Sequence, residues 1–242
     1  MSEPSAFRAE PILSFALDGS SPEQATVPTT VLGYEILRGR RRCPIWRPAR
    51  NWRAWYLAMM TRHIPEMVRA LPSGQRIFIN LSSAQILDPT IQALVTACPY
   101  ADRLVVEWIE TPVHRRTLMA AARLFGHLRE VGVQVAIDDV GTGHGQDGFG
   151  RLSLTGADYL KVDGRVLIRA RRHKAARATL RALAAAAHDA PGTLLIVEWV
   201  ETIADWHLAR DCGADAWQGF LSRDLGLNCS INGFTKGGMD EA

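Results

Sequence analysis

Residues 135–143 constrain the fold of this chain more than any other stretch. An apolar run, residues 135–137, leads directly into Asp138 and Asp139, and a Gly-Thr-Gly turn follows Val140. A short apolar run that ends at glycines predicts a strand buried on both faces, because a strand with one face in water alternates apolar and polar residues. The two neighbouring carboxylates are therefore expected at the carboxyl end of a buried strand.

Asp138 and Asp139 admit two interpretations at this point. Adjacent carboxylates repel each other and are costly to remove from water, so a strand end that keeps both usually offers them a cation. Mg²⁺ or Mn²⁺ would suit, because both are hard ions that prefer oxygen ligands. The alternative is that one Asp caps the following segment and the other faces water.

Strand patterns alternate with helix patterns along the chain. The expected strands comprise residues 11–17, 31–37, 76–81, 104–109, the stretch that begins at Val135, 158–163, 193–198 and 214–219. The expected helices comprise residues 51–70, 83–97, 112–131, 174–188 and 203–209, and residues 141–150 are expected to form a glycine-rich loop. This order predicts parallel strands joined by right-handed crossovers, and about eight strands favour a closed α/β barrel over an open sheet.

Composition agrees with one large domain. The chain has 242 residues, of which 47% are hydrophobic and 22% charged, enough to bury a full core. We expect the barrel to span residues 8–225 and residues 226–242 to form a polar tail. No apolar stretch is long enough to cross a membrane and the first residues lack a signal peptide pattern, which predicts a cytoplasmic protein without a membrane partner. Cys43, Cys98, Cys212 and Cys229 form no CxxC pair, so no zinc or redox motif is predicted.

Positive charge is concentrated although the net charge is only +3. One cluster comprises Arg38, Arg40, Arg41, Arg42, Arg47, Arg50 and Arg53. A second comprises Arg165, Arg169, Arg171, Arg172 and Lys174. Such clusters attract phosphates, and nucleic acid is one conceivable partner. The alternative is a solvated charged face. The first cluster has the stronger claim to function because Arg38 lies three residues from Glu35, an acid of the expected site.

Polar residues recur near the carboxyl ends of the expected strands. In chain order they are Glu35, Asn80, Glu107, Asp138, Asp139, Lys161, Glu198 and Gln218. In a barrel these positions converge on one face, where barrel enzymes place their chemistry. Carboxylates gathered in this way can hold two divalent ions, an arrangement that splits phosphate esters by in-line attack of a metal-activated water. Lys161 adds a cation that can hold this water or a phosphoryl oxygen.

The same segments carry a resemblance to a known family. They are Gly33-Tyr34-Glu35-Ile36-Leu37, Ile79-Asn80-Leu81-Ser82, Glu107-Trp108-Ile109-Glu110-Thr111, Asp138-Asp139-Val140-Gly141-Thr142-Gly143, Lys161-Val162-Asp163, Glu198-Trp199-Val200-Glu201-Thr202 and Gln218-Gly219-Phe220-Leu221-Ser222-Arg223. In this order they resemble the motifs of the EAL domain, the cyclic di-GMP phosphodiesterase. The resemblance covers residues 10–223.

Resemblance to that family implies a modified TIM (β/α)8 barrel with an antiparallel first strand. It also implies hydrolysis of cyclic di-GMP to linear pGpG with Mg²⁺ or Mn²⁺. The implied ligands of the first metal are Glu35, Asn80, Glu107 and Asp138. Asp138 would bridge to a second metal, beside Asp139 and Glu198. Lys161 would orient or help deprotonate the attacking water, and Gln218 would position water or substrate. Glu110 would anchor the loop after the Asp pair, and Glu201 would support Glu198.

The chain departs from the family pattern at several positions. The Arg expected to contact substrate is replaced by Gly39, flanked by Arg38 and Arg40. Trp199 replaces a glycine next to Glu198, where it would narrow the pocket, stack on a guanine or serve only structure. Asp163 points the same way as Lys161 along a strand, which predicts either a substrate contact or a structural salt bridge.

Two functions therefore stand beside each other. The first is a metal-dependent cyclic di-GMP phosphodiesterase, inhibited by Ca²⁺ because its longer and looser bonds spoil the in-line geometry. The second is a barrel that has lost turnover and acts as a cyclic di-GMP receptor or a protein-binding regulator. Retention of every expected ligand favours the enzyme, whereas Gly39, Trp199 and the altered segment 140–157 favour the receptor. A homodimer through the loop after Asp139 is expected, and no nucleic-acid polymer.

Overall fold

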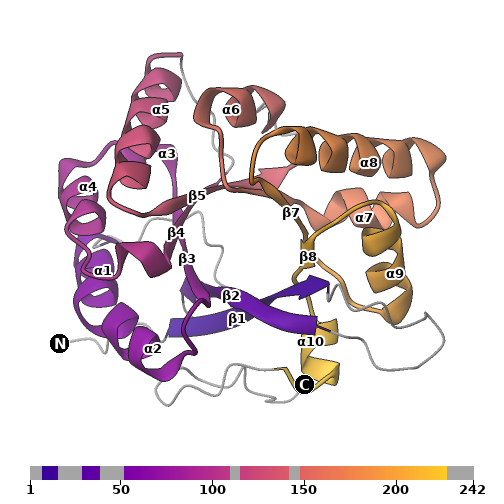
Figure 1. Cartoon of the computed structure of the whole chain (residues 1–242), viewed down its shortest axis with the longest axis horizontal. Helices are drawn as coiled ribbons and strands as arrows, with labels where there is room; N and C mark the ends of the chain where they lie inside the picture. The colour runs from indigo at the N-terminus through magenta and orange to yellow at the C-terminus, as the bar shows by residue number, and fades with distance from the viewer. Residues whose placement is uncertain (1–6, 16–28, 39–51, 110–114, 142–147, 228–242) are drawn as a thin grey trace.

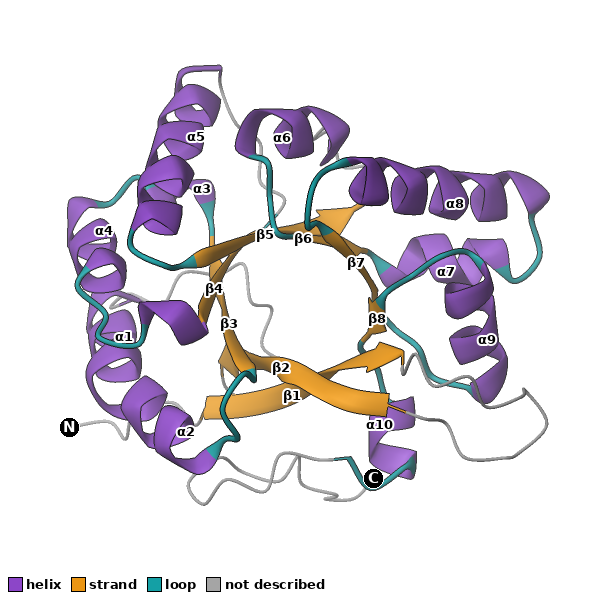
Figure 2. Ribbon diagram, viewed as in Figure 1, coloured by secondary structure: helices purple, strands orange, loops and turns teal. Residues whose placement is uncertain are grey.

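Eight strands form a closed barrel in the computed structural model. The structure describes residues 7–15, 29–38, 52–109, 115–141 and 148–227, and within them it does not describe the side chains of residues 29, 38, 115–117 and 148–149. The strands are β1 (Phe7–Phe15), β2 (Thr29–Arg38), β3 (Arg76–Leu81), β4 (Leu104–Trp108), β5 (Gln134–Val140), β6 (Tyr159–Val162), β7 (Leu194–Val197) and β8 (Ala216–Trp217). They follow one another around the ring in chain order, with the helices outside (Figure 2).

The helices cover the outer face of this ring (Figure 1). Between β2 and β4 lie α1 (Trp52–Ala58), the π-helical turn η1 (Met59–His63), α2 (Ile64–Ala70), α3 (Ser83–Ile86), α4 (Pro89–Thr96) and the 3₁₀ turn η2 (Ala101–Arg103). After β4 come α5 (Arg115–Glu130), α6 (Gly148–Thr155), α7 (Gly164–Ala170), α8 (Lys174–Asp189), α9 (Ile203–Asp211) and α10 (Leu221–Asp224). The expected alternation of strands and helices is confirmed.

The first strand runs against the others. β1 pairs antiparallel with β2 and with β8, while every neighbouring pair from β2 to β8 is parallel. The α/β barrel with an antiparallel first strand is therefore confirmed. A parallel barrel gathers the carboxyl ends of its strands at one opening, called here the mouth.

Strand alternation produces two apolar layers. Inside the ring lie Ile12, Phe78, Val105, Ala136, Tyr159, Ile196 and Ala216, all buried. The residues between them face outward and pack on the helices, as Trp108 of β4 does against Phe125 of α5, with ring centroids 5.4 Å apart. Both faces of the strands are thus apolar, which explains why the strand sequences are uniformly apolar rather than alternating.

Helix bounds differ from the sequence predictions in several places, and the short helix α10 (Leu221–Asp224) was not predicted. The helix predicted at residues 83–97 is split into α3 and α4, because Asp88 caps α4 through hydrogen bonds from the Thr90 and Ile91 amides and Pro89 begins the new helix. The loop predicted at 141–150 is too long, since α6 already begins at Gly148. Helix α7 was not predicted; it follows β6 after the single residue Asp163.

Several other sequence predictions concern the surface and the chain ends. None of the helices described here has the length and apolar character needed to span a membrane. Cys98 and Cys212 are buried free thiols, and Cys43 and Cys229 lie outside the described residues. Most of the first arginine cluster and the tail from residue 228 onward also lie outside them, so the predicted domain limits remain predictions.

Candidate active site

The polar residues predicted at the strand ends form the layer directly above the inner apolar layer. Side chains two residues apart on a strand point the same way. On the parallel strands β3 to β8, each inner apolar residue is therefore followed, two positions later, by a polar residue at the mouth. These pairs are Phe78 and Asn80, Val105 and Glu107, Ala136 and Asp138, Tyr159 and Lys161, Ile196 and Glu198, and Ala216 and Gln218.

Glu35 of β2 also lies at the mouth, and the residue two positions before it, at the level of the inner apolar layer, is Gly33. A Cβ on Gly33 would lie 2.4 Å from the Arg76 carbonyl oxygen and 2.9 Å from Cε2 of Phe78. The inner layer therefore has no room for a side chain at residue 33, because Phe78 fills that space. The absence of a side chain below Glu35 follows from the packing of the barrel interior.

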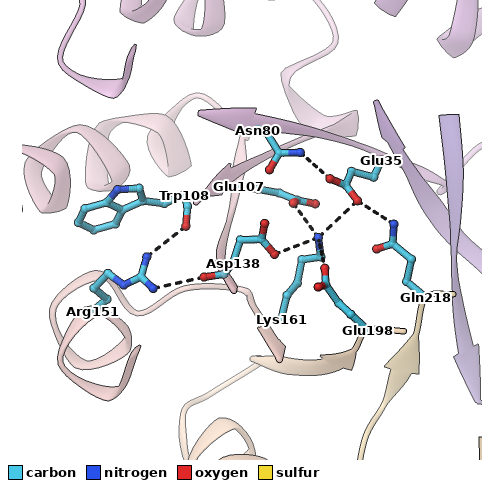
Figure 3. A network of polar contacts seen from close by, with 9 residues as sticks. All are labelled: Glu35, Asn80, Glu107, Trp108, Asp138, Arg151, Lys161, Glu198 and Gln218. Atoms are coloured by element: carbon cyan, nitrogen blue, oxygen red, sulfur yellow. Dashed lines mark hydrogen bonds and ion pairs between the residues drawn. The ribbon is translucent and has the colours of Figure 1, made fainter. Parts of the chain in front are cut away.

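Lys161 lies at the centre of the polar layer, enclosed by four carboxylates (Figure 3). Its Nζ lies at the following distances from them: 2.8 Å to Glu107 Oε2, 2.9 Å to Glu198 Oε1, 3.1 Å to Asp138 Oδ1 and 3.5 Å to Glu35 Oε2. Lys161 and Glu107 are fully buried. The acids come from four different strands or strand ends, so the barrel itself gathers them.

Two amides complete the layer on the side of Glu35. Asn80 Nδ2 donates to Glu35 Oε1, and Gln218 Nε2 donates to Glu35 Oε2 over 2.7 Å. Each amide therefore uses its nitrogen to hold Glu35. Its oxygen remains as an acceptor or a metal ligand.

Asp139 joins the site because its backbone is left-handed. Neighbouring residues on a strand normally point to opposite faces, so Asp138 and Asp139 should diverge. Asp139 instead has φ 58°, and the pairing of β5 with β6 shifts between Ile137 and Val140. Carboxylate oxygens of Asp138, Asp139 and Glu198 consequently lie within 4.8 Å of one another.

The balance of charge in the site is negative. Burial raises the pKa of Glu107 and of Glu198 well above the ordinary value, and Lys161 only partly offsets this. Burial also raises the pKa of Asp138, and burial together with the Asp138 charge raises the pKa of Asp139 to about 7. One ammonium group cannot compensate for the burial of all these acids.

Glu35 and Lys161 shift toward their charged forms. Burial raises the pKa of Glu35, but Lys161 and the amides of Gln218 and Asn80 outweigh it, so that the pKa lies below the ordinary value. Burial lowers the pKa of Lys161, but the surrounding carboxylates raise it well above its ordinary value. Lys161 is thus an ammonium ion.

The donor set fits divalent metal ions. The candidate ligands are oxygen atoms from carboxylates and amides, which Mg²⁺ and Mn²⁺ prefer. Among the described residues, Glu107 Oε1 and Gln218 Oε1 are buried without a hydrogen-bond partner. Unpaired buried oxygens and excess negative charge are both costly without a cation. The described acids therefore suit an additional cation better than they suit Lys161 alone.

The residues predicted to contact substrate differ in their exposure and in their contacts. Trp199 is 43% exposed, has φ 56° and lies against Gly164, where an added Cβ would be 2.1 Å from its Cγ. Asp163 is buried and caps α7: its Oδ1 accepts from the Arg165 amide over 2.7 Å and lies 3.3 Å from Arg165 Nε. Arg38 ends β2, but its side chain is not described. The roles of Asp163 and Trp199 toward substrate remain predictions.

Of the remaining predicted site residues, the structure describes only Glu201. Glu201 is exposed just before α9, and its side chain has no contact with Glu198 among the contacts described. The predicted support of Glu198 by Glu201 stays a prediction. Arg40 and Glu110 lie outside the described residues, as does most of the loop after Asp139 that was expected to form a dimer contact.

Two residues near the site were not predicted. Tyr56 of α1 donates its hydroxyl hydrogen to the carbonyl oxygen of Asn80. Arg151 of α6 is buried and donates to the carbonyl oxygens of Trp108 and Asp138 (Figure 3). Tyr56 lay in a predicted helix and Arg151 in an unassigned stretch, and no sequence signal linked either to a strand end.

Comparison with known proteins agrees with this geometry. The family model described as the EAL domain matches residues 54–237, most of the chain, although Glu35 lies ahead of the matched part. The chain belongs to the EAL domain family. Among curated proteins of Escherichia coli K12, this EAL domain is 33% identical over 110 residues to PdeN, a probable cyclic di-GMP phosphodiesterase. It is 30% identical over 160 residues to PdeF, a cyclic di-GMP phosphodiesterase.

The matched regions span about a fifth of the length of these curated relatives. The matches cover 43% and 63% of this chain, but only 20% of PdeN and 21% of PdeF. Among solved structures, BlrP1 of Klebsiella pneumoniae in a calcium and cyclic di-GMP complex superposes with a TM-score of 0.72 at 20% identity. That match covers 90% of this EAL domain and 55% of BlrP1, and it shows a shared fold.

Proposed function

We propose that this EAL domain is a metal-dependent phosphodiesterase that hydrolyses cyclic di-GMP to linear pGpG. The observation that carries the proposal is the mouth of the barrel, where Glu35, Glu107, Asp138 and Glu198 enclose Lys161 and Asp139 turns inward to join them. The names of PdeN and PdeF and the cyclic di-GMP complex of BlrP1 support the choice of substrate.

Mg²⁺ or Mn²⁺ would be the metal, in two neighbouring positions. Glu35, Asn80, Glu107 and Asp138 would hold the first ion, and Asp138, Asp139 and Glu198 the second. When bound, the ions supply an activated water and neutralise the charge that develops on the phosphate. Ca²⁺ would bind but inhibit, because its longer and looser coordination does not hold an in-line geometry. A manganese complex of BlrP1 with cyclic di-GMP supports this metal class.

Lys161 would act as a hydrogen-bond donor. Its pKa lies well above the ordinary value because carboxylates surround it. An ammonium ion has three donors and no acceptor, so in the metal-free protein Lys161 can orient a water or a phosphoryl oxygen. Metal ions on the carboxylates would offset the charge that raises this pKa, so both roles that the family resemblance implies, orienting the water and helping to deprotonate it, stay proposals. Gln218, held through its nitrogen, would present its oxygen to water or substrate.

The substrate would lie over the mouth. Trp199 offers an exposed aromatic face there, and aromatic side chains stack on bases without sequence preference. Asp163, Arg38 and Arg40 are the further proposed substrate contacts. We place the enzyme in the cytoplasm, and we expect a homodimer through the segment after Asp139 and no nucleic-acid polymer as partner.

Incubation with cyclic di-GMP and Mn²⁺, followed by chromatographic detection of pGpG, tests the proposal. Activity should require Mg²⁺ or Mn²⁺ and stop with Ca²⁺. Glu35→Ala and Asp138→Ala should abolish it with the fold intact, whereas Glu130→Ala, which removes an exposed carboxylate from α5, should leave it unchanged. Equal turnover in excess chelator would contradict the metal mechanism.

A second candidate function is supported by Trp199. A bulky side chain in a left-handed backbone next to Glu198 is strained, and strained residues cluster at ligand clamps as well as at active sites. A receptor for cyclic di-GMP without turnover would bind the nucleotide with Ca²⁺ present and yield no pGpG with Mg²⁺ or Mn²⁺. Removal of the obstruction by Trp199→Gly should then raise hydrolysis.

A further inference from the structure

Arg151 is a buried cation that lies outside the ring of acids but touches two of the strands that carry them. It belongs to α6 and is only 2% exposed. Its Nη1 donates to the carbonyl oxygen of Trp108 over 3.2 Å, and its Nη2 donates to the carbonyl oxygen of Asp138 over 3.3 Å. Its Cζ lies 5.4 Å from the centroid of the Trp108 ring.

These two carbonyl groups lie where the regular pairing of β5 with its two neighbouring strands ends. The last pair between β4 and β5 is Trp108 with Ile137. On the other side of β5, the pairing with β6 shifts between Ile137 and Val140. Asp138 therefore stands just beyond the regular ladder on both sides. Arg151 spans the gap from one strand end to the next (Figure 3).

The two residues whose carbonyl groups Arg151 holds adjoin or belong to the candidate active site. Trp108 follows Glu107 directly, and Asp138 contributes its own carboxylate. A shift of either backbone would move a carboxylate that contacts Lys161, at 2.8 Å and 3.1 Å respectively. A planar guanidinium group offers two parallel donors at fixed spacing, which a leucine or a lysine cannot reproduce. Burial of a charge is costly, so packing alone would favour an apolar residue at this position.

We propose that Arg151 is a positioning residue, which sets the separation of Glu107 and Asp138 by fixing the carbonyl groups of Trp108 and Asp138 from α6. The proposal rests on the proposed function in one respect: it takes these two acids as metal ligands. Arg151 itself does not touch the reacting groups. Its effect on metal binding passes through the two strand ends.

The chain offers a matched control in Arg103. This residue also holds two backbone carbonyl groups, with Nε donating to Gln75 over 2.6 Å and Nη2 donating to Pro72 over 2.8 Å. It precedes β4, at the end of the barrel away from the mouth. Arg103→Met and Arg151→Met therefore remove the same kind of contact at opposite ends of the barrel.

The experiment measures Mn²⁺ binding to the metal-free protein by calorimetric titration, with thermal unfolding recorded for each variant. We expect Arg151→Met to raise the Kd for Mn²⁺ by about tenfold or more, as loss of a residue that supports metal ligands does. Arg103→Met should lower Tm and leave the Kd unchanged. Arg151→Lys keeps the charge but not the paired donors, and should also weaken Mn²⁺ binding.

Each outcome decides the proposal. An unchanged Kd in Arg151→Met, or in Arg151→Lys if the Met variant does not fold, would overturn it. The same would follow if Arg103→Met weakened Mn²⁺ binding equally. If the wild type binds Mn²⁺ with the expected dependence on Arg151 but forms no pGpG, the positioning role of Arg151 is supported and the proposed phosphodiesterase activity is contradicted. A wild type that binds no Mn²⁺ would overturn both.

Discussion

Lys161 is one ammonium ion among four carboxylates, and the two kinds of residue should respond oppositely to mutation. Lys161→Met leaves buried carboxylates without their cation, which should lower the free energy of unfolding of the metal-free protein by about 3 kcal/mol or more. Glu107→Gln removes a charge from an excess of acids, and burial already raises the pKa of Glu107. Its stability should equal or exceed that of the wild type.

Urea denaturation at pH 8 in the presence of a chelator measures both effects. Glu130→Gln, on the exposed surface of α5, controls for the substitution itself. An unchanged stability of Lys161→Met would mean that the surrounding acids are neutral in the folded protein. The electrostatic account given for the site would then be wrong.

Trp199 should contribute to nucleotide binding through its exposed ring. Trp199→Ala is expected to weaken cyclic di-GMP binding by about 1 to 3 kcal/mol, because one base would lose its stacking partner. Trp199→Phe keeps an aromatic face and should retain most of the affinity. Titration in the presence of Ca²⁺ prevents turnover during the measurement. Equal affinity of all three proteins would exclude stacking.

At the scale of elements, Gly164 at the start of α7 and Trp199 after β7 are tightly packed against each other. A Cβ on residue 164 would lie 2.1 Å from Trp199 Cγ and 2.3 Å from Trp199 Cβ. Gly164→Ala should therefore destabilise the protein by about 1 to 3 kcal/mol through overpacking. In the Trp199→Gly background the conflicting atoms are gone, and the same substitution should cost little.

A double-mutant cycle measured by urea denaturation tests this coupling. Gly156→Ala is a useful comparison, since it also changes a glycine but no atom lies within 4 Å of the added Cβ. It carries a left-handed φ of 55°, so its cost reports backbone strain rather than packing. An equal cost of Gly164→Ala in both backgrounds would contradict the packing argument.

The sequence was sufficient for the elements whose pattern is local. Strands β3 to β8 were located because the inner and outer layers make them uniformly apolar, and the polar layer followed from their ends. The split between α3 and α4 was also encoded, in the cap and turn formed by Asp88 and Pro89, but the helical periodicity on both sides obscured it. Helix α6 begins within a glycine-rich stretch and therefore lacked a start signal.

The parts of the site that sequence could not supply depend on distant contacts. The inward turn of Asp139 requires a left-handed backbone that strand alternation does not predict. The contact of Arg151 with the Trp108 carbonyl joins residues 43 positions apart. Strand alternation alone would turn Trp199 away from the face that Glu198 uses, whereas its left-handed φ of 56° lays it against Gly164. Side-chain types reveal candidate ligands, whereas backbone exceptions appear only in the fold.

For the whole molecule, the buried acids predict how stability depends on pH. Asp139 has a pKa of about 7 in the folded metal-free protein and about 4 when unfolded. Between these values the unfolded chain releases a proton that the folded protein retains, so stability falls as pH rises from about 4 to about 7. Glu107, Asp138 and Glu198 shift in the same direction.

Thermal unfolding with and without Mn²⁺ checks this dependence. The Tm of the metal-free protein should be lower at pH 7.5 than at pH 5.5, by about 3 °C or more. Saturating Mn²⁺ should remove the difference, because the metal binds the deprotonated acids. Asp139→Asn should flatten the profile of the metal-free protein. A Tm that rises over this range, with no difference between wild type and Asp139→Asn, would contradict the pKa directions.

The seam between β1 and β8 has a consequence for how the protein folds. In the described part of the chain, two residue pairs close it, Leu13 with Trp217 and Ser14 with Ala216, and the Phe15 amide donates to the Asp215 carbonyl oxygen beside them. These contacts join opposite ends of the described chain. Pairing over such separations is slow because the chain loses the most entropy when it closes the largest loop. The bond from Gln218 to Glu35 spans 183 positions and lies beside this seam. We therefore expect the polar layer to be completed in the last step of folding. The backbone amide hydrogens of β8 should exchange with solvent sooner than those of β4 and β5.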